Sequence, residues 1–172
     1  EPGNLGPGWV GFDYAAAFGH PVRIFNDAAM QALGSYDGGR MLFLGLGTGL
    51  GSALIAEKAI LPLELGRLAL GDGNTLGEVL GRQGYKKLGK AAWRDTLQKA
   101  VSSLMAAFVV DYVVIGGGNA KNVKNLPPGT RLGHNLTAFR GGFRLWHLDD
   151  VNTLSGEERP PAPPTPTDWR II

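Results

Sequence analysis

Residues 42–55 read Leu42-Phe43-Leu44-Gly45-Leu46-Gly47-Thr48-Gly49-Leu50-Gly51-Ser52-Ala53-Leu54-Ile55, and the rest of the chain is organised around them. The apolar runs 41–44 and 52–55 are short and bounded by glycine, which predicts the two strands of a hairpin. Glycine lets the backbone turn sharply and approach a ligand, because it has no Cβ. Successive N–H groups in such a turn, together with the Thr48 hydroxyl, form a donor surface for phosphate oxygens. The sequence therefore predicts a phosphate-binding hairpin, with a glycine-rich hairpin that binds nothing as the alternative.

The glycine spacing excludes two other phosphate-binding motifs. A dinucleotide fingerprint needs Gly-x-Gly-x-x-Gly before a helix. From Gly45 or Gly47 the third glycine would fall on Leu50 or Ser52, so this pattern fails. A Walker A loop fails as well, because no Gly-Lys-Ser/Thr follows. A Rossmann oxidoreductase is therefore a distant alternative.

Composition indicates an ordinary globular chain. Its 172 residues suffice for one domain, or for one domain with a piece of another, and 44% are hydrophobic against 19% charged. The net charge is only +2 and no basic run is interleaved with aromatics, so we expect no nucleic-acid partner. No apolar stretch is long enough for a membrane span. The absence of cysteine excludes disulfides and thiolate metal sites and fits a cytoplasmic location.

Upstream of the hairpin, we expect a short helix over 12–18, a strand over 22–25 and a helix over 28–34 that Gly34 stops. Asp27 then lies where the strand ends and the helix begins. There it is either the N-cap of the helix or a ligand-binding group, since ligands bind at strand ends in open α/β sheets.

Downstream, residues 91–110 carry apolar side chains at spacings of three and four, which predicts a helix with one face on a sheet. Residues 111–115 predict a buried strand that ends at glycines 116–118, and 143–146 predict a final strand. The tail from Gly156 is rich in proline and is expected to be extended or disordered.

Three polar positions between the hairpin and the long helix bear on the prediction. Glu64 is an acid among apolar neighbours, either a solvated position or a ligand-binding group. Thr75 and Glu78 have the spacing of a capping box, which predicts a helix start.

Four motifs carry a family resemblance when they are taken in order: Phe25-Asn26-Asp27-Ala28, the glycine turn 45–51, Glu64-Leu65-Gly66-Arg67, and Ile115-Gly116-Gly117-Gly118. They resemble the ROK-family sugar kinases of the actin-like ATPase superfamily, and the branch most similar is polyphosphate glucokinase. The resemblance covers roughly residues 1–146. It implies an α/β, actin-like ATPase (ribonuclease H-like) fold, mainly the C-terminal lobe plus the end of the N-terminal lobe. Residues 1–36 would end the first lobe, 37–155 would form the second, and 156–172 the tail.

The resemblance also implies roles for single residues. Asp27 would be the general base, and Asn4, Asn26 and Glu64 would bind sugar hydroxyls. Gly47, Thr48 and Gly49 would bind the transferring phosphate, with Gly116, Gly117 and Gly118 against the nucleotide. Mg²⁺ would accompany ATP or polyphosphate, and neither a resident metal nor a structural zinc is expected.

Two departures leave two hypotheses of different classes. The family's N-terminal Asp-x-Gly-Gly-Thr loop is absent, which indicates a partial chain, and Arg67 stands where the family has histidine. The first hypothesis is a hexose kinase that transfers a phosphoryl group to the 6-hydroxyl of glucose or a related hexose in carbohydrate metabolism. The second is a non-catalytic, sugar-binding regulator. A homodimer formed through the long helix stays open.

Overall fold

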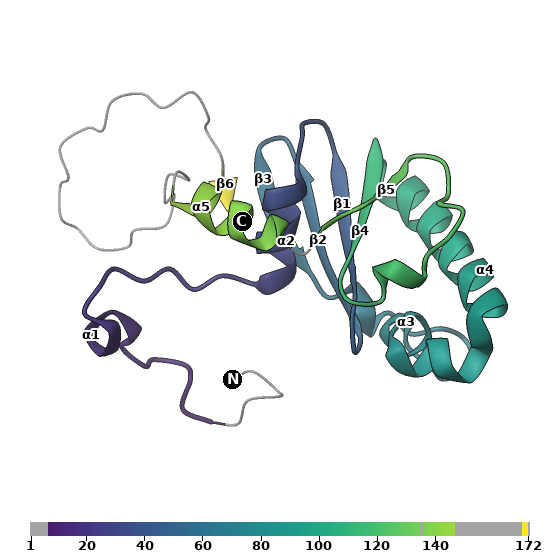
Figure 1. The fold of residues 1–172 in the computed structure, drawn as a ribbon, viewed down its shortest axis with the longest axis horizontal. Helices are drawn as coiled ribbons and strands as arrows, with labels where there is room; N and C mark the ends of the chain where they lie inside the picture. Colours follow the sequence, from purple (N-terminus) through teal and green to yellow (C-terminus); the bar gives the residue numbers. More distant parts are fainter. Residues whose placement is uncertain (1–6, 135, 147–169, 172) are drawn as a thin grey trace.

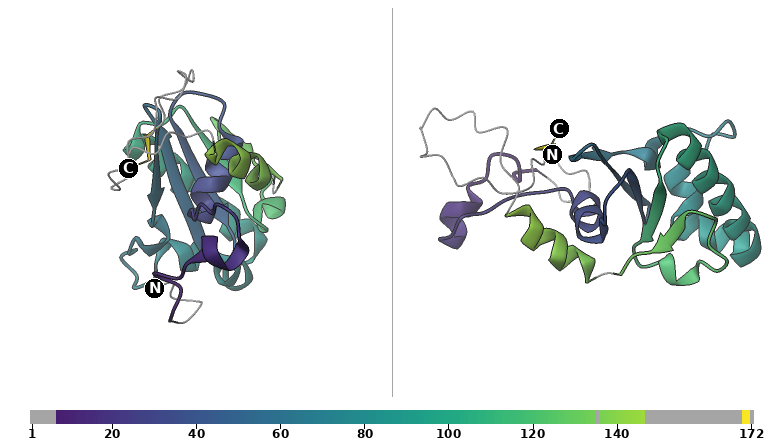
Figure 2. Two further views of the ribbon diagram at one scale, coloured as in Figure 1. Left: turned by 90° about the vertical axis from the view of Figure 1, so that its left-hand side faces the viewer. Right: turned by 90° about the horizontal axis from the view of Figure 1, so that it is seen from above.

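The computed structural model describes residues 7–134, 136–146 and 170–171. They form an α/β protein in three layers, with a mixed sheet between two layers of helices (Figures 1 and 2). The sheet has the order β5-β4-β1-β2-β3-β6. Its strands are β1 (Met41–Leu46), β2 (Leu50–Ala56), β3 (Ala59–Leu63), β4 (Tyr112–Gly116), β5 (Thr130–Leu132) and β6 (Arg170–Ile171). The helices are α1 (Tyr14–Phe18), α2 (Asp27–Ser35), α3 (Leu76–Leu80), α4 (Arg82–Phe108) and α5 (Thr137–Leu145), with short 3₁₀ turns η1 (Leu65–Arg67) and η2 (Ala120–Asn122).

The predicted hairpin is confirmed. β1 and β2 pair antiparallel from Met41↔Ile55 to Leu46↔Leu50, so residues 47–49 form the turn. β4 pairs in parallel with β1, with Gly116 opposite Gly45. This confirms the predicted strand before the second glycine cluster and brings both clusters to the same end of the sheet.

The core lies on both sides of β1, because successive side chains of a strand point to opposite faces. Leu42, Leu44 and Leu46 face α3 and α4, whereas Met41 and Phe43 face α2. The predicted apolar face of the long helix is confirmed: Trp93, Leu97 and other side chains of α4 are buried on the sheet. The predicted capping box is also present at the start of α3.

On the other face, α2 crosses α5 at a contact between two glycines. A Cβ on Gly34 would lie 1.7 Å from the Thr137 carbonyl oxygen, and one on Gly141 would lie 1.9 Å from the Met30 carbonyl oxygen. Two predictions are wrong here. Gly34 lies inside α2 rather than stopping it, because its missing side chain admits the neighbouring backbone. Residues 143–146 are not a strand: they form the end of α5 and its C-cap, because packing against α2 decides their conformation.

The segment before α2 extends away from the sheet (Figure 1). The predicted short helix is present as α1, but none of its residues is buried. The predicted strand at 22–25 is wrong. Ile24 is 70% exposed, and no strand within the described residues pairs with this segment, so its backbone has no ladder to join. Arg23 anchors the segment to α5, where its Nη1 donates to the Leu145 carbonyl oxygen at 2.6 Å.

Most of the predicted proline-rich tail lies outside the described residues. Its described part, Arg170–Ile171, is β6, which pairs in parallel with β3. The predicted boundaries at residues 36 and 155 stay predictions, while α2 itself packs on the sheet. No helix in the described ranges is long and apolar enough to cross a membrane.

Candidate active site

Three of the predicted segments lie at one end of the sheet. β1 and β4 are parallel, and β3 is antiparallel to β2 and so runs in the direction of β1. The turn 47–49, Glu64 and glycines 117–118 therefore follow strands that end on the same side. This is the carboxyl edge, where open α/β sheets bind ligands.

The turn 47–49 keeps its carbonyl oxygens engaged and its outer surface open. The Arg82 N–H donates to the Gly47 and Thr48 carbonyl oxygens at 3.1 and 3.3 Å. The N–H groups of Thr48 and Gly49 have no acceptor among the described residues. A Cβ on Gly47 or Gly49 would meet nothing within 4 Å. An oxyanion that approached this turn would therefore meet backbone N–H groups that are free to donate. Gly47 and Gly49 do not have a positive φ, so what they contribute is the absence of a side chain, which lets a ligand come close to the backbone.

The second glycine cluster packs directly on this turn. Gly117 has φ +81°, and a Cβ there would lie 2.5 Å from the Leu46 carbonyl oxygen, so only glycine fits. A Cβ on Gly116 would meet the Phe43 ring at 2.6 Å, whereas Gly118 faces open space. The Asn119 Nδ2 donates to the Gly47 carbonyl oxygen at 2.9 Å. The structure therefore brings together the predicted phosphate and nucleotide segments.

Two residues of this arrangement were missed at the level of sequence. Asn119 binds the turn with its side chain, and its position directly after three glycines was the available signal. Gly81, between α3 and α4, touches the turn: a Cβ there would lie 2.4 Å from the Thr48 carbonyl oxygen. Nothing in the local pattern around Gly81 indicates this long-range contact.

Asp27 lies at the N-terminus of α2, exposed to solvent. The N-cap is Asn26, whose Oδ1 accepts from the Ala29 N–H at 3.0 Å, so the alternative that Asp27 caps the helix is wrong. Asp27 Oδ1 accepts from the Ala28 N–H at 2.8 Å. A Cβ on Gly51 would lie 3.2 Å from the Ala28 Cβ, so this helix end lies beside the start of β2. Asp27 thus lies at the same end of the sheet as the turn.

Glu64 follows β3 and is also exposed, with 73% of its side chain accessible. Its Oε2 lies 3.6 Å from Nε of Arg67, at the position where the sequence resemblance implies a histidine. A pair this exposed is weak, so Glu64 can exchange Arg67 for another partner. Asn4, the remaining predicted sugar-binding residue, lies outside the described residues.

An open cavity of about 890 Å³ brings Thr48, Gly49 and Glu64 to one space, with α3 and the start of α4 as its other walls. Asp27 is not among its lining residues. Asp72 and Glu78 add negative charge and Lys87 adds positive charge. The pKa of Asp72 is below its usual value, chiefly because the Asn74 N–H donates to it.

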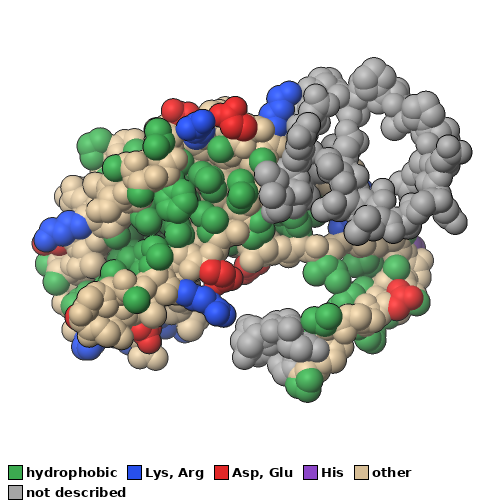
Figure 3. Space-filling view, turned by 180° about the vertical axis from the view of Figure 1, so that it is seen from behind, with side chains coloured by type: hydrophobic (Ala, Val, Ile, Leu, Met, Phe, Trp, Pro, Cys, Tyr) green, Lys and Arg blue, Asp and Glu red, His purple; other side chains and the backbone are tan. Residues whose placement is uncertain are grey.

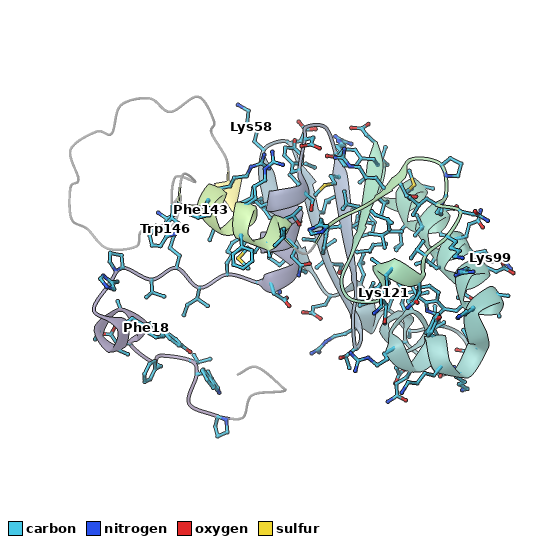
Figure 4. The ribbon with its side chains drawn as sticks, in the orientation of Figure 1. Phe18, Lys58, Lys99, Lys121, Phe143 and Trp146 are labelled. Carbon is cyan, nitrogen blue, oxygen red and sulfur yellow. The ribbon has the colours of Figure 1, made fainter. Side chains whose placement is uncertain are left out.

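The surface near the carboxyl edge of the sheet carries both acidic and basic side chains. Seen from behind, acidic and basic side chains lie together next to the segment that leads to α1, at the margin of a hydrophobic area (Figure 3). Lys121, on η2 just after the second glycine cluster, lies on the α4 side, far from Lys58 in the β2–β3 turn (Figure 4). No group of three or more His, Cys, Asp or Glu side chains that could hold a metal occurs in the part of the chain that the structure describes.

Neither a protein-family model nor a curated protein matches the chain. Among solved structures, the inorganic polyphosphate/ATP-glucomannokinase of Arthrobacter sp. matches with a TM-score of 0.62 at 27% identity, over 77% of this chain and 60% of that one. A ROK family protein from Streptococcus pneumoniae, in complex with sucrose, matches with a TM-score of 0.59 at 15% identity, over 79% and 70%. A ROK family glucokinase from Streptomyces griseus, in complex with glucose and AMPPNP, matches with a TM-score of 0.50 at 16% identity, over 76% and 70%.

These matches identify the fold of the chain. The fold is that of the sugar kinases among the actin-like ATPases, as the four motifs predicted. Its structural neighbours are ROK-family sugar kinases, including a polyphosphate/ATP glucomannokinase. The chain spans 60% of the length of that glucomannokinase.

Proposed function

We propose that this chain is part of a hexose kinase that transfers a phosphoryl group from ATP or polyphosphate to the 6-hydroxyl of glucose or a related hexose. One observation carries the proposal. The turn 47–49 presents free N–H groups at the edge of the sheet where the exposed carboxylate of Asp27 also lies. Phosphoryl transfer needs a cradle for the phosphate and a base for the attacking hydroxyl. In this proposal the turn 47–49 supplies the first and Asp27 supplies the second.

In this mechanism Asp27 accepts the proton of the sugar hydroxyl while the hydroxyl oxygen attacks the terminal phosphorus. The bond from that phosphorus to the donor breaks, and the donor leaves one phosphate shorter. The N–H groups of Thr48 and Gly49 stabilise the charge on the transferring group. Asn26 and Glu64 hold the sugar so that the reacting oxygen is in line.

Magnesium belongs to the donor in this proposal. Mg²⁺ would arrive with the phosphates of ATP or polyphosphate, since magnesium is usually bound through substrate phosphates together with one or two carboxylates. When bound, it neutralises charge on the phosphate oxygens. The residues of this chain supply the backbone donors and the base.

The second candidate is a sugar-binding regulator without catalysis. It is favoured by Arg67, which faces the Glu64 carboxylate at 3.6 Å in place of the family's histidine. Such a protein would bind a hexose through Asn26 and Glu64 and transfer no phosphate.

The test is a phosphotransfer assay of the full-length protein with glucose, in which ATP and polyphosphate are supplied in parallel, beside calorimetric titration of glucose. We expect Asp27→Asn to lower turnover by about 10²- to 10⁴-fold while the glucose Kd stays within about threefold, since proton transfer contributes on that scale. Asp95→Asn, an exposed carboxylate on α4, is the matched control and should leave turnover unchanged. Glucose binding without turnover in the parent protein would favour the regulator. Absence of both would overturn the proposal.

A further inference from the structure

Ser52, on β2, is the one buried polar side chain among the residues that the structure describes, with 1% of its surface exposed. It lies one position after Gly51, which packs beside the helix of Asp27. A buried hydroxyl is costly unless it is hydrogen-bonded. The partners of the Ser52 hydroxyl therefore indicate the role of this residue.

Both hydrogen bonds of Ser52 go to the backbone on either side of Glu64. Its Oγ donates to the Leu63 carbonyl oxygen at 2.9 Å and accepts from the Leu65 N–H at 3.1 Å. One hydroxyl thus ties down the residue before Glu64 and the residue after it. Glu64 itself has φ −110° and ψ 46°, which is neither strand nor helix, and no side-chain hydrogen bond caps η1. The Glu64 carbonyl oxygen accepts from the Arg67 N–H at 2.9 Å, and the Ser52 hydroxyl adds a hold on the backbone at both neighbours of Glu64.

A second contact supports the same segment from β2. A Cβ on Gly66 would lie 2.7 Å from the Leu50 carbonyl oxygen, so the 3₁₀ turn is pressed onto the strand. Residues 50–52 therefore touch the elements that carry both predicted sugar-side carboxylates. Gly51 lies beside the start of α2, and Ser52 flanks Glu64.

We propose that Ser52 is the positioning residue for Glu64: it fixes the backbone on both sides of that carboxylate and so sets where the carboxylate meets the sugar hydroxyls. This rests on the proposed function, because it makes Ser52 a determinant of hexose affinity without contact with the hexose. The competing explanation is that Ser52 only stabilises the sheet. In that case its loss would lower stability and leave sugar affinity alone.

The backbone part of the proposal has a test that needs no sugar. In hydrogen–deuterium exchange, Ser52→Ala should accelerate exchange in the peptide that spans residues 62–68 by about tenfold or more, because the Leu65 N–H loses its acceptor. Thr130→Ala is the matched control: the Thr130 Oγ1 also donates to a backbone carbonyl, that of Pro127, at 2.6 Å, but Thr130 begins β5 at the opposite end of the sheet. Unchanged exchange at 62–68 in Ser52→Ala would overturn the proposal, even if the protein does not bind glucose at all.

The affinity part is tested by a double-mutant cycle on glucose binding and on KM. Ser52→Ala should raise the glucose Kd and KM by about tenfold and change kcat by less than about twofold. The reason is that a displaced Glu64 carboxylate makes a weaker contact with the hexose. Ser52→Ala should have no further effect in a Glu64→Ala background, because a residue that acts through Glu64 has nothing left to position. Additive effects would show that Ser52 acts independently of Glu64 and would overturn the proposal. Ser52→Thr keeps the hydroxyl and, if it folds, should restore the exchange rate at 62–68.

Discussion

Single glycines at the edge of the sheet differ in what they do, and Gly117 and Gly118 are adjacent examples. Gly117 has φ +81° and lies against the Leu46 backbone, whereas Gly118 has an ordinary φ and nothing within 4 Å of a Cβ position. The first is required by the fold. The second is open to whatever binds at this edge.

We expect Gly117→Ala to lower the free energy of unfolding by about 2 kcal/mol or more, because alanine at this φ is strained and its Cβ overlaps the Leu46 carbonyl. Gly118→Ala should change the free energy of unfolding by less than about 0.5 kcal/mol. Urea denaturation of both variants measures the difference. Equal stabilities would contradict the steric assignment, and a weaker Kd for ATP in Gly118→Ala alone would support a nucleotide-side role for this glycine.

At the scale of elements, the helices and strands that have a local sequence pattern could be predicted from the sequence. The hairpin, β4 and the apolar face of α4 follow from short apolar runs, glycine boundaries and helical spacing. The elements that depend on a distant partner could not. Residues 143–146 have aromatic and apolar character that suits a strand, yet α5 forms there because two glycines let it cross α2 closely. Residues 22–25 suit a strand as well, yet none of the described strands pairs with them.

The same division holds in the candidate site. The turn 47–49 and glycines 116–118 could be found from motif order, since their chemistry is in the backbone. Asn119, Gly81 and Ser52 could not be assigned a role, because each acts through contacts with residues 11 to 72 positions away in the sequence. Sequence distance, rather than residue type, hides such contacts.

The capping box of α3 gives a prediction about pH at this scale. Thr75 donates to the Glu78 carboxylate from its N–H and from its hydroxyl, at 2.7 and 3.0 Å, and these bonds hold the pKa of Glu78 below its usual value. A carboxyl whose pKa is lower in the folded state stabilises the fold above its unfolded pKa, about 4.3, and loses this effect as the pH falls through the folded pKa. Glu78→Gln should therefore reduce Tm at pH 7, with a difference that shrinks as the pH is lowered toward 3.

Thermal unfolding of both proteins from pH 7 to pH 3 measures this. In a Thr75→Ala background the pH-dependent difference should become smaller but persist, because the hydroxyl donor is lost while the residue 75 N–H, the larger cause of the lowered pKa of Glu78, is kept. A constant difference in Tm across the pH range would mean that the charge of Glu78 is not the source of the stabilisation.

At the scale of the whole molecule, the candidate site is assembled from both layers of helices. Asp27 comes from α2 on one face of the sheet, while Gly81 and Arg82 hold the turn 47–49 from α3 and α4 on the other. β1 joins the layers, since its alternate side chains enter both hydrophobic clusters. The geometry of the site therefore depends on the two layers folding as one unit.

Leu97→Ala tests whether they do. Leu97 is 1% exposed in the cluster between α4 and the sheet, so its truncation should lower the free energy of unfolding by about 2–5 kcal/mol. If the sheet couples the layers, the slowest-exchanging amides of α2, on the opposite face, should lose the same free energy of exchange as those of α4. Leu68→Ala, at a leucine that is 47% exposed, is the control and should change neither set. If the α2 amides kept their protection while those of α4 lost it, the layers would open separately, and Asp27 could then move relative to the turn 47–49 without global unfolding.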